Sequence, residues 1–411
     1  MTVEQARHSK LTIGLCLLAA VMEGFDLQAA GVVAAGIRTD FGLTPGQLGL
    51  FFSAATAGLI VGALIGGRIA DAYGRKLGLV TSLALFGVFS LATGLTDDFA
   101  TMLVARLLTG VGLGGAMPNL VAIAAEAADP RRRATAVAVM FAGIPLGGAL
   151  AGLFAMSGLY GTGEWRVIFV VGGVAPLLLV PVLMKLLPPL IIPPVPAAQR
   201  GETSLGRALF GRETILATVT LWLASFLSLL ILYLILNWLP SLLVSRGFTP
   251  GQAGLVQLVF NVVGALAGIF IGKAMDGRGA VAAVVIVYAT LVAALLFFAM
   301  LPTDMTLAVL AAAILGPGLL GAQALLYGLS PKCYPDWARG TGVGASVAVG
   351  RLGSVTGPLL AGGLVATGSS AGGVLAVLVP IAAVAGLAAL LLTWRIGRLH
   401  PHSGAGARSG Q

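Results

Sequence analysis

The chain alternates long apolar stretches with short polar segments. Each apolar stretch is about 20 residues long or somewhat longer, which is the length at which an α-helix crosses the hydrocarbon core of a bilayer. Twelve such stretches follow one another, six in each half of the chain. The predicted spans are 11–37, 47–67, 77–96, 100–125, 134–160, 167–184, 214–240, 253–272, 281–301, 305–331, 341–366 and 371–393.

The composition agrees with an all-α polytopic membrane protein. Apolar residues make up 58% of the 411 residues and charged residues only 9%, whereas a soluble domain carries about 25% charged residues. These figures exclude a soluble enzyme, a disordered chain and a secreted disulfide scaffold. A transmembrane β-barrel would show short alternating segments instead of long apolar runs. The two cysteines, Cys16 and Cys333, have neither metal nor disulfide spacing, and we expect no cofactor.

The basic residues fall almost entirely on one side of the predicted membrane. With the N-terminus inside, 19 of the 24 Lys and Arg lie in cytoplasmic segments. This asymmetry predicts that both termini, and the loop that holds Cys333, are cytoplasmic. The net charge of +9 then records topology and contact with anionic lipid, so we expect no nucleic-acid partner. The exceptions are Arg38, Arg166 and Arg246 on the outer side, and Arg106 and Arg351 inside spans.

The spans divide into two similar halves. Five prolines between residues 185 and 213 predict an extended linker. We therefore assign 1–184 to an N-terminal six-helix half, 185–213 to a cytoplasmic linker, 214–395 to a C-terminal six-helix half and 396–411 to a disordered cytoplasmic tail. The pattern Gly-basic-x-x-Asp at Gly67 recurs 205 residues later at Gly272. A parallel repeat of six helices is typical of transporters.

Two motifs resemble the major facilitator superfamily. The segment 67–76, with sequence GRIADAYGRK, resembles that family's signature between spans two and three, although Ala72 stands where a basic residue is usual. The segment 106–112, RLLTGVG, resembles its fourth-span motif. The resemblance implies a twelve-helix major facilitator fold with alternating access. It also implies that the first segment, read as a tight loop, latches a cytoplasmic gate. Because the sequence shows no catalytic residue set and no soluble domain, we expect no enzymatic activity.

We expect the gating residues to lie at the cytoplasmic ends of the spans. The alternative is a set of surface ion pairs worth about 0–1 kcal/mol each. The gating candidates are Gly67, Asp71, Gly74, Arg75, Glu126, Arg133 and Arg339.

A narrower resemblance lies in the first span. Residues 23–26 read Glu-Gly-Phe-Asp and resemble the aromatic acid:proton symporters, whose motif is usually Asp-Gly-x-Asp, so that Glu23 departs from it. The resemblance implies proton-driven import of a small aromatic carboxylate across the bacterial inner membrane. The expected substrate is 3-(3-hydroxyphenyl)propionate or a related phenylpropanoid acid. A proton-coupled antiporter that exports drugs or metabolites, and a membrane sensor or enzyme, are the alternatives.

Four charges lie inside the spans, where each costs about 2.5–3.5 kcal/mol. Glu23 and Asp26 share one face of a helix. We expect them to form a proton-coupling pair, with protons as the coupling ion. Asp26 is the first candidate for the transported proton and Glu23 its tuning neighbour; a static buried pair is the alternative.

The two arginines inside the spans have different predicted roles. Arg351 lies near the middle of its span, and its guanidinium can hold a substrate carboxylate with two parallel hydrogen bonds. The alternative is an ion pair with Asp26 or Glu23 that holds the halves together. Arg106 lies nearer the outer end of its span. It either shares in proton transfer with the first span or donates hydrogen bonds to span carbonyls.

An aromatic acid also needs an apolar slot and a polar handle. Tyr327 follows Gln323 at i+4, so the two face the same way on a helix. Packing is the alternative for each aromatic, whereas buried unpaired amides are costly. Apart from the substrate and the lipid bilayer, no obligate partner is expected. The further candidates for substrate contact are Phe226, Tyr233, Asn237, Trp238, Gln323 and Tyr327.

Overall fold

The computed structural model describes residues 3–158, 164–187, 209–211, 214–274, 280–334 and 339–399. Over these residues the protein is helical and has no β-strand. Twelve of the described helices or helix pairs are long and apolar enough to cross a membrane. The predicted all-α polytopic class is thereby confirmed.

The helices follow the predicted spans closely. In the first half they are α1 (Val3–Val32), α2 (Ala34–Phe41), α3 (Pro45–Tyr73), α4 (Arg75–Gly94), α5 (Phe99–Ala127), η1 (Pro130–Arg132), α6 (Arg133–Phe141), α7 (Gly143–Met156) and α8 (Arg166–Leu186). In the second half they are α10 (Ile215–Val244), α11 (Pro250–Ala274), α12 (Ala280–Ala299), α13 (Met305–Leu329), η3 (Ser330–Cys333), α14 (Arg339–Ala366) and α15 (Ala371–Leu399).

Some boundaries differ from the prediction. The fifth span is interrupted at Ala142, between α6 and α7. The predicted linker begins too early, because α8 continues to Leu186; residues 188–208 and 212–213 of that linker lie outside the described residues. The predicted tail also begins too early, because α15 runs to Leu399 and Ile396 still packs against the core. Residues 400–411 lie outside the described part of the chain.

The predicted loop at 67–76 is mostly helical. Asp71 belongs to the last turn of α3, and Arg75 is the first residue of α4. Gly74 alone joins the two helices, with φ at 90°. This left-handed conformation is accessible to glycine without a Cβ clash, so the chain reverses within one residue instead of a longer loop.

Polar caps fix the ends of helices outside the spans. Thr44 accepts a hydrogen bond from the Gln47 amide and begins α3. Asp98 begins α5, and its Oδ1 accepts a hydrogen bond of 2.9 Å from the Thr101 amide. The hydrogen bonds from Thr101 hold the pKa of the Asp98 carboxyl below its usual value. These caps satisfy amides that a helix start leaves without intrahelical partners.

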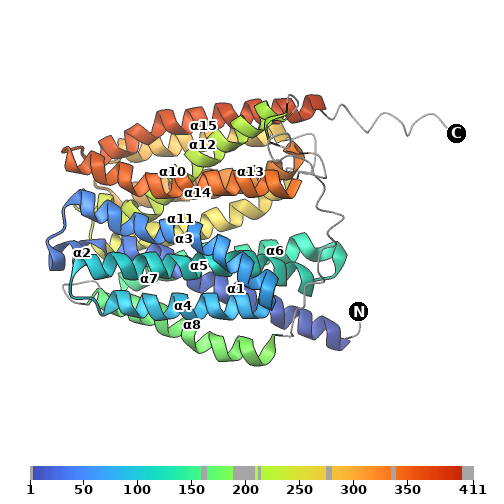
Figure 1. Cartoon of the computed structure of the whole chain (residues 1–411). Coiled ribbons are helices and arrows are strands. Elements are labelled where there is room, and N and C mark those ends of the chain that lie inside the picture. Colours follow the sequence, from blue (N-terminus) through green and yellow to red (C-terminus); the bar gives the residue numbers. More distant parts are fainter. Residues whose placement is uncertain are drawn as a thin grey trace.

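The helices form two bundles that pack side by side. Figure 1 shows α1 to α8 below and most of α10 to α15 above, with the start of α1 and the end of α15 at the same end of the molecule. The bundles meet where α3 packs on α14, α7 on α11, and α1 on α10. We call the end that holds both chain ends the terminal end, and the opposite end the distal end.

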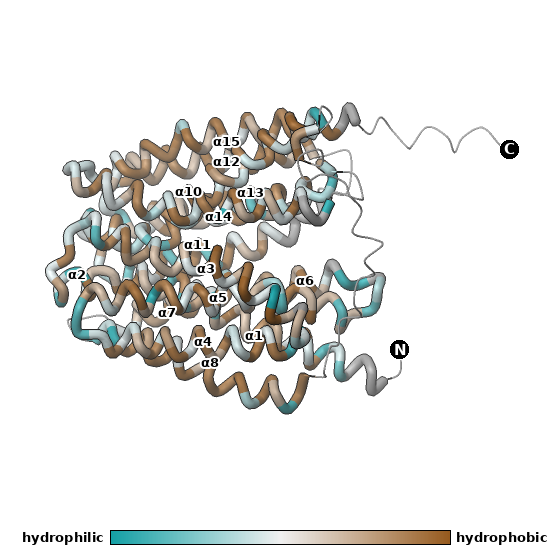
Figure 2. Tube along the Cα trace, viewed as in Figure 1, coloured by the Kyte–Doolittle hydropathy of each residue, from teal (hydrophilic) through white to brown (hydrophobic). Residues whose placement is uncertain are grey.

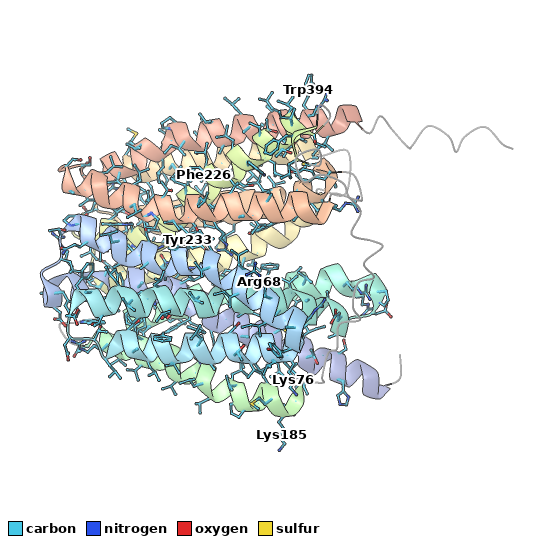
Figure 3. The ribbon with its side chains drawn as sticks, viewed as in Figure 1. Arg68, Lys76, Lys185, Phe226, Tyr233 and Trp394 are labelled. Atoms are coloured by element: carbon cyan, nitrogen blue, oxygen red, sulfur yellow. The ribbon has the colours of Figure 1, made fainter. Side chains whose placement is uncertain are left out.

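Hydropathy follows the direction of the helices. Figure 2 shows apolar residues along most of their length and polar residues concentrated towards both ends of the bundle. Arg68, Lys76 and Lys185 lie towards the terminal end (Figure 3). The distribution is that of a multi-pass membrane protein, because charged groups avoid the hydrocarbon layer.

The two bundles touch most closely towards the distal end. A Cβ atom on Gly31 would lie 2.6 Å from the Asn237 carbonyl oxygen of the other bundle, and one on Gly49 would lie 2.9 Å from that of Pro358. Only glycine permits such an approach of two backbones. Gly67, at the terminal end of α3, has no neighbour within 4 Å of its Cβ position. The distal end is therefore closed by direct backbone contact.

Candidate functional site between the two bundles

A buried ion pair ties the first span to the fourth. Arg106 Nη1 donates to Asp26 Oδ2 over 2.9 Å. Ser90 Oγ, on α4, donates to the other oxygen of the same carboxylate over 2.8 Å. Asp26 and Arg106 are each only 1% exposed. Both charges are therefore matched inside the N-terminal bundle.

Aromatic rings enclose the arginine of this pair. The Arg106 Cζ lies 5.7 Å from the centre of the Phe51 ring and 5.3 Å from that of Phe169. A guanidinium is attracted to such ring faces. Its described hydrogen bond goes to Asp26 and not to a carbonyl of the span. The other prediction is that Arg106 shares in proton transfer with the first span. That role requires contact with α1, which the ion pair with Asp26 provides.

Glu23 is buried without such a partner. Its side chain is on α1, one turn before Asp26, and the residue is 2% exposed. No hydrogen bond reaches its buried Oε2 atom. It interacts electrostatically with Arg351 and, more weakly, with Asp26, but it forms no ion pair among the described residues.

Arg351 lies near the middle of α14 and is half-buried. Its Nη1 donates to Tyr233 Oη over 2.7 Å, and its Cζ lies 6.0 Å from the centre of the Tyr233 ring. It also interacts electrostatically with Tyr327 and Glu23. The alternative expected from the sequence is an ion pair of Arg351 with Asp26 or Glu23. Neither pair is formed among the described residues, and Asp26 is matched by Arg106 instead.

We call Glu23, Tyr233, Tyr327 and Arg351 the central cluster. Its members come from α1, α10, α13 and α14, so both bundles contribute. Figure 3 shows Tyr233 between the two bundles, away from both ends. A guanidinium carries five N–H donors, and the described hydrogen bond of Arg351 uses one nitrogen. The cluster therefore offers a cation with an available hydrogen-bonding edge beside a carboxylate.

Three other predicted contact residues make no described contact with the side chains of this cluster. Asn237 Nδ2 donates to the Tyr233 carbonyl over 2.7 Å, within its own helix. Trp238 Nε1 donates to the Pro358 carbonyl over 3.1 Å, and its ring meets the Phe52 ring edge-on at 5.5 Å. Phe226 packs where α10 crosses α14. These contacts are those of helix packing.

Gln323 lies one turn before Tyr327 on α13 and is half-buried. Its Nε2 is buried and has no hydrogen-bond partner. An unpaired buried amide is costly. Among the predicted contact residues, Gln323 is therefore the one whose side-chain amide lacks an acceptor that a bound ligand can supply.

A cluster of buried amides was missed by the sequence reasoning. Gln28 and Asn261 exchange two hydrogen bonds between their side chains, of 3.0 and 2.8 Å. Gln257 Nε2 also donates to Gln28 Oε1. The cluster joins α1 to α11 across the two bundles. The available signal was the pair Gln257 and Asn261, two costly amides four residues apart in one span.

An aromatic pair across the interface was also missed. The Phe141 ring on α6 and the Tyr327 ring on α13 lie nearly parallel, at 26°, with their centres 6.3 Å apart. Tyr327 is 46% exposed. No spacing within the sequence relates residues of the fifth and tenth spans, so this pair is visible only in the fold.

The gating candidates gather at the terminal end. Arg75 forms an ion pair with Glu126, which lies in the last turn of α5. Arg133 is exposed and begins α6, whereas Arg339 begins α14 and donates from Nε to the Pro331 carbonyl over 3.2 Å. The described ion pair thus links helices within one bundle.

The side chain of Asp71 lies outside the described residues. One contact beside the gating candidates was not expected. Lys76 Nζ donates to the carbonyls of Met184 and Leu187, over 2.7 and 2.6 Å. It neutralises the carbonyl end of α8, where cations are favoured.

A small pocket lies near the distal end, where α1, α2, α7, α10 and α11 meet. Its lining is apolar apart from the hydroxyl of Ser241. It offers no cation to a carboxylate, so the chemistry lies with the central cluster.

Comparisons with known proteins agree with this architecture. The family model of the Major Facilitator Superfamily matches residues 16–346 and 221–409. The 3-(3-hydroxyphenyl)propionate transporter of Escherichia coli K12 is 46% identical over 95% of this chain and 96% of its own length. The 4-hydroxybenzoate transporter PcaK of Pseudomonas aeruginosa is 32% identical, covering 92% of this chain and 91% of its own.

The fold is also that of solved transporters. The partially occluded, inward-open structure of the xylose transporter XylE from E. coli matches with a TM-score of 0.74, over 94% of this chain and 98% of that one, at 15% identity. These relatives are transporters and not enzymes. With a matching family model, high identity over nearly the whole length and a shared twelve-helix fold, the chain is a transporter of the Major Facilitator Superfamily.

Proposed function

We propose that this protein is a proton-coupled symporter that imports an aromatic carboxylate by alternating access. The proposed substrate is 3-(3-hydroxyphenyl)propionate or a related phenylpropanoid acid, as for the E. coli relative of 46% identity. The proposed site of action is the bacterial inner membrane. The asymmetry of basic residues supports a cytoplasmic position for the terminal end.

The observation that carries the proposal is the position of Arg351. It is a half-buried cation between the bundles, and Tyr233 holds it with one hydrogen bond. A carboxylate can take the remaining donors in a bidentate pair. Gln323 and Tyr327 lie on one face of α13 and supply the polar handle and the ring surface. Asn237 and Trp238 support the proposed binding site by packing between helices.

Glu23 is the proposed carrier of the proton. At Asp26 a proton would have to displace the Arg106 guanidinium and the Ser90 hydroxyl, whereas the Glu23 Oε2 atom has no partner to displace. In this scheme Asp26 and Arg106 shape the coupling site from within the N-terminal bundle. This assignment reverses the order of the two carboxylates expected from the sequence.

Coupling follows from the electrostatics of the central cluster. Arg351 is the cation that acts on the Glu23 carboxylate. When a substrate carboxylate binds Arg351, it cancels that cation, and the Glu23 charge is left in a poorly solvated site. Proton uptake by Glu23 then removes the remaining charge. The anion and the proton cross together because each lowers the cost of the other.

Alternating access uses the two ends of the interface. The described state is closed distally by contacts such as Gly31 on Asn237. The gating residues Gly67, Asp71, Gly74, Arg75, Glu126, Arg133 and Arg339 lie at the terminal end, which closes when the distal contacts separate.

Uptake into right-side-out vesicles under an inward proton gradient tests the proposed function. We expect accumulation of labelled 3-(3-hydroxyphenyl)propionate that collapses when a protonophore is added. Accumulation that follows a sodium gradient would overturn proton coupling. Expulsion of the acid from loaded vesicles under the same proton gradient would identify an antiporter instead.

A further inference from the structure

The rings of Phe141 and Tyr327 form an aromatic contact across the interface, and Tyr327 belongs to the central cluster. Phe141 is the last residue of α6 in the N-terminal bundle, and Tyr327 lies in the last turn of α13 in the C-terminal bundle. Tyr327 interacts electrostatically with Arg351. The pair thus lies beside the proposed carboxylate anchor.

The Phe141 and Tyr327 rings present two nearly parallel faces, one from each bundle. Carbon atoms in contact are about 3.5–4.0 Å apart, so a ring between two parallel rings needs centres about 7 Å apart. The Phe141 and Tyr327 centres are 6.3 Å apart, and their planes differ by 26°. The two rings are therefore in ordinary aromatic contact, and a planar ring enters between their faces only when the bundles separate.

The Phe141–Tyr327 pair lies on the side of Arg351 that is nearer to the terminal end, towards which an imported substrate is released. Arg351 lies near the middle of α14, whereas Tyr327 is close to the terminal end of its helix. Tyr327 is 46% exposed although it faces the opposite bundle. A ring used only for packing in a closed interface would be covered. Tyr327 therefore lies closer to the terminal end than Arg351 does, with part of its side chain uncovered.

We propose that Phe141 and Tyr327 clamp the aromatic ring of the substrate between them while its carboxylate binds Arg351. This inference rests on the proposed function and assigns Phe141 as a specificity residue that the sequence did not indicate. Two aromatic faces select a planar ring over a saturated ring of similar size. Because each bundle supplies one face, the clamp forms only when the bundles hold the substrate together.

The test compares two competitors that differ only in the ring. Equilibrium binding of labelled 3-(3-hydroxyphenyl)propionate to the purified full-length protein is competed with 3-phenylpropionate or 3-cyclohexylpropionate. We expect the wild type to prefer the phenyl acid. Phe141→Leu should reduce that preference roughly 2- to 12-fold, which is the range for one aromatic contact, whereas Phe141→Tyr should retain it.

Controls separate the clamp from general damage to the fifth span. Phe154→Leu changes a partly buried phenylalanine of α7 and should leave the preference unchanged. Tyr327→Leu should reduce the preference from the other side of the interface, and Tyr327→Phe should keep it. These variants decide the matter if Phe141→Leu does not fold.

The clamp and the proposed function fail in different ways. A wild type that binds labelled acid, together with Phe141→Leu and Tyr327→Leu variants that keep the full phenyl preference, would overturn the clamp and leave the function standing. A wild type that binds no aromatic acid would overturn the function itself. A slower transport rate in Phe141→Leu with an unchanged preference would show a gate that does not touch the ring, and would also overturn the clamp.

Discussion

Arg106 and Asp26 form a fully buried ion pair with 2.9 Å between Nη1 and Oδ2, while Glu23, one turn away, has a buried oxygen without a partner. The two carboxylates of the first span therefore differ in surroundings although they lie on the same helix face. Asp26 is fixed within one bundle by Arg106 and Ser90. Glu23 faces a cation of the opposite bundle. This difference is the basis for proposing Glu23, and not Asp26, as the proton carrier.

Glu23→Gln should abolish proton-driven accumulation while the protein still folds. Glutamine has nearly the same shape, and the substitution removes no described hydrogen bond. Counterflow exchange of labelled for unlabelled acid should persist, because exchange does not require release of the proton. Asp97→Asn is a control, since the Asp97 side chain is 97% exposed. Normal protonophore-sensitive accumulation by Glu23→Gln would exclude Glu23 as the carrier.

Asp26→Asn should destabilise the protein, because it leaves the Arg106 charge buried and unmatched. Breaking one partner of a buried pair costs about 3–5 kcal/mol, whereas replacing both partners is often nearly neutral. The double variant Asp26→Asn, Arg106→Gln should therefore regain thermal stability in detergent. An unfolding temperature of Asp26→Asn equal to that of the wild type would contradict a structural role for this pair.

Arg351→Lys should weaken binding of the acid although the positive charge remains, because lysine lacks the planar fork. Arg351→Ala should weaken it further. A neutral amide analogue of the substrate supplies the comparison, since it does not need the cation. Equal losses for acid and amide in Arg351→Ala, measured by equilibrium binding, would reduce Arg351 to a structural residue.

Native cysteines are poor reporters of orientation. Both Cys16 and Cys333 are buried in the structure, so the cytoplasmic loop position expected for Cys333 does not make it reactive. Asp97→Cys at the distal end and Lys332→Cys at the terminal end are exposed instead. An impermeant thiol reagent outside intact cells should label Asp97→Cys and reach Lys332→Cys only after permeabilisation. The reverse pattern would invert the proposed orientation.

Gly31→Val should open the distal end, because its side chain would occupy the space of the Asn237 carbonyl. We expect slower transport and faster labelling, from outside the cell, of a Ser241→Cys reporter beside the distal pocket. Gly46→Val is the matched control, since no atom lies within 4 Å of its Cβ position. Unchanged labelling of the reporter in Gly31→Val would show that this contact does not close the distal end.

The sequence by itself determined the twelve spans, the two halves and the four intramembrane charges. Spans can be recognised in the sequence because a bilayer requires about 20 apolar residues in succession. Charged residues such as Glu23 and Arg351 are then easily identified within these apolar stretches. The helix ends were less certain. The reversal at Gly74 needs one residue where the motif suggested a loop.

Only the tertiary structure decided which charges and rings meet. Periodicity places Glu23 and Asp26 on one face of a helix, but it cannot say that Arg106 reaches Asp26 from α5. In the same way, burying the polar side chain of Asn237 is costly if it has no partner, yet a carbonyl of its own helix accepts its hydrogen bond. Such side-chain partners depend on how helices distant in sequence cross. The sequence of one helix does not identify the helices that pack against it.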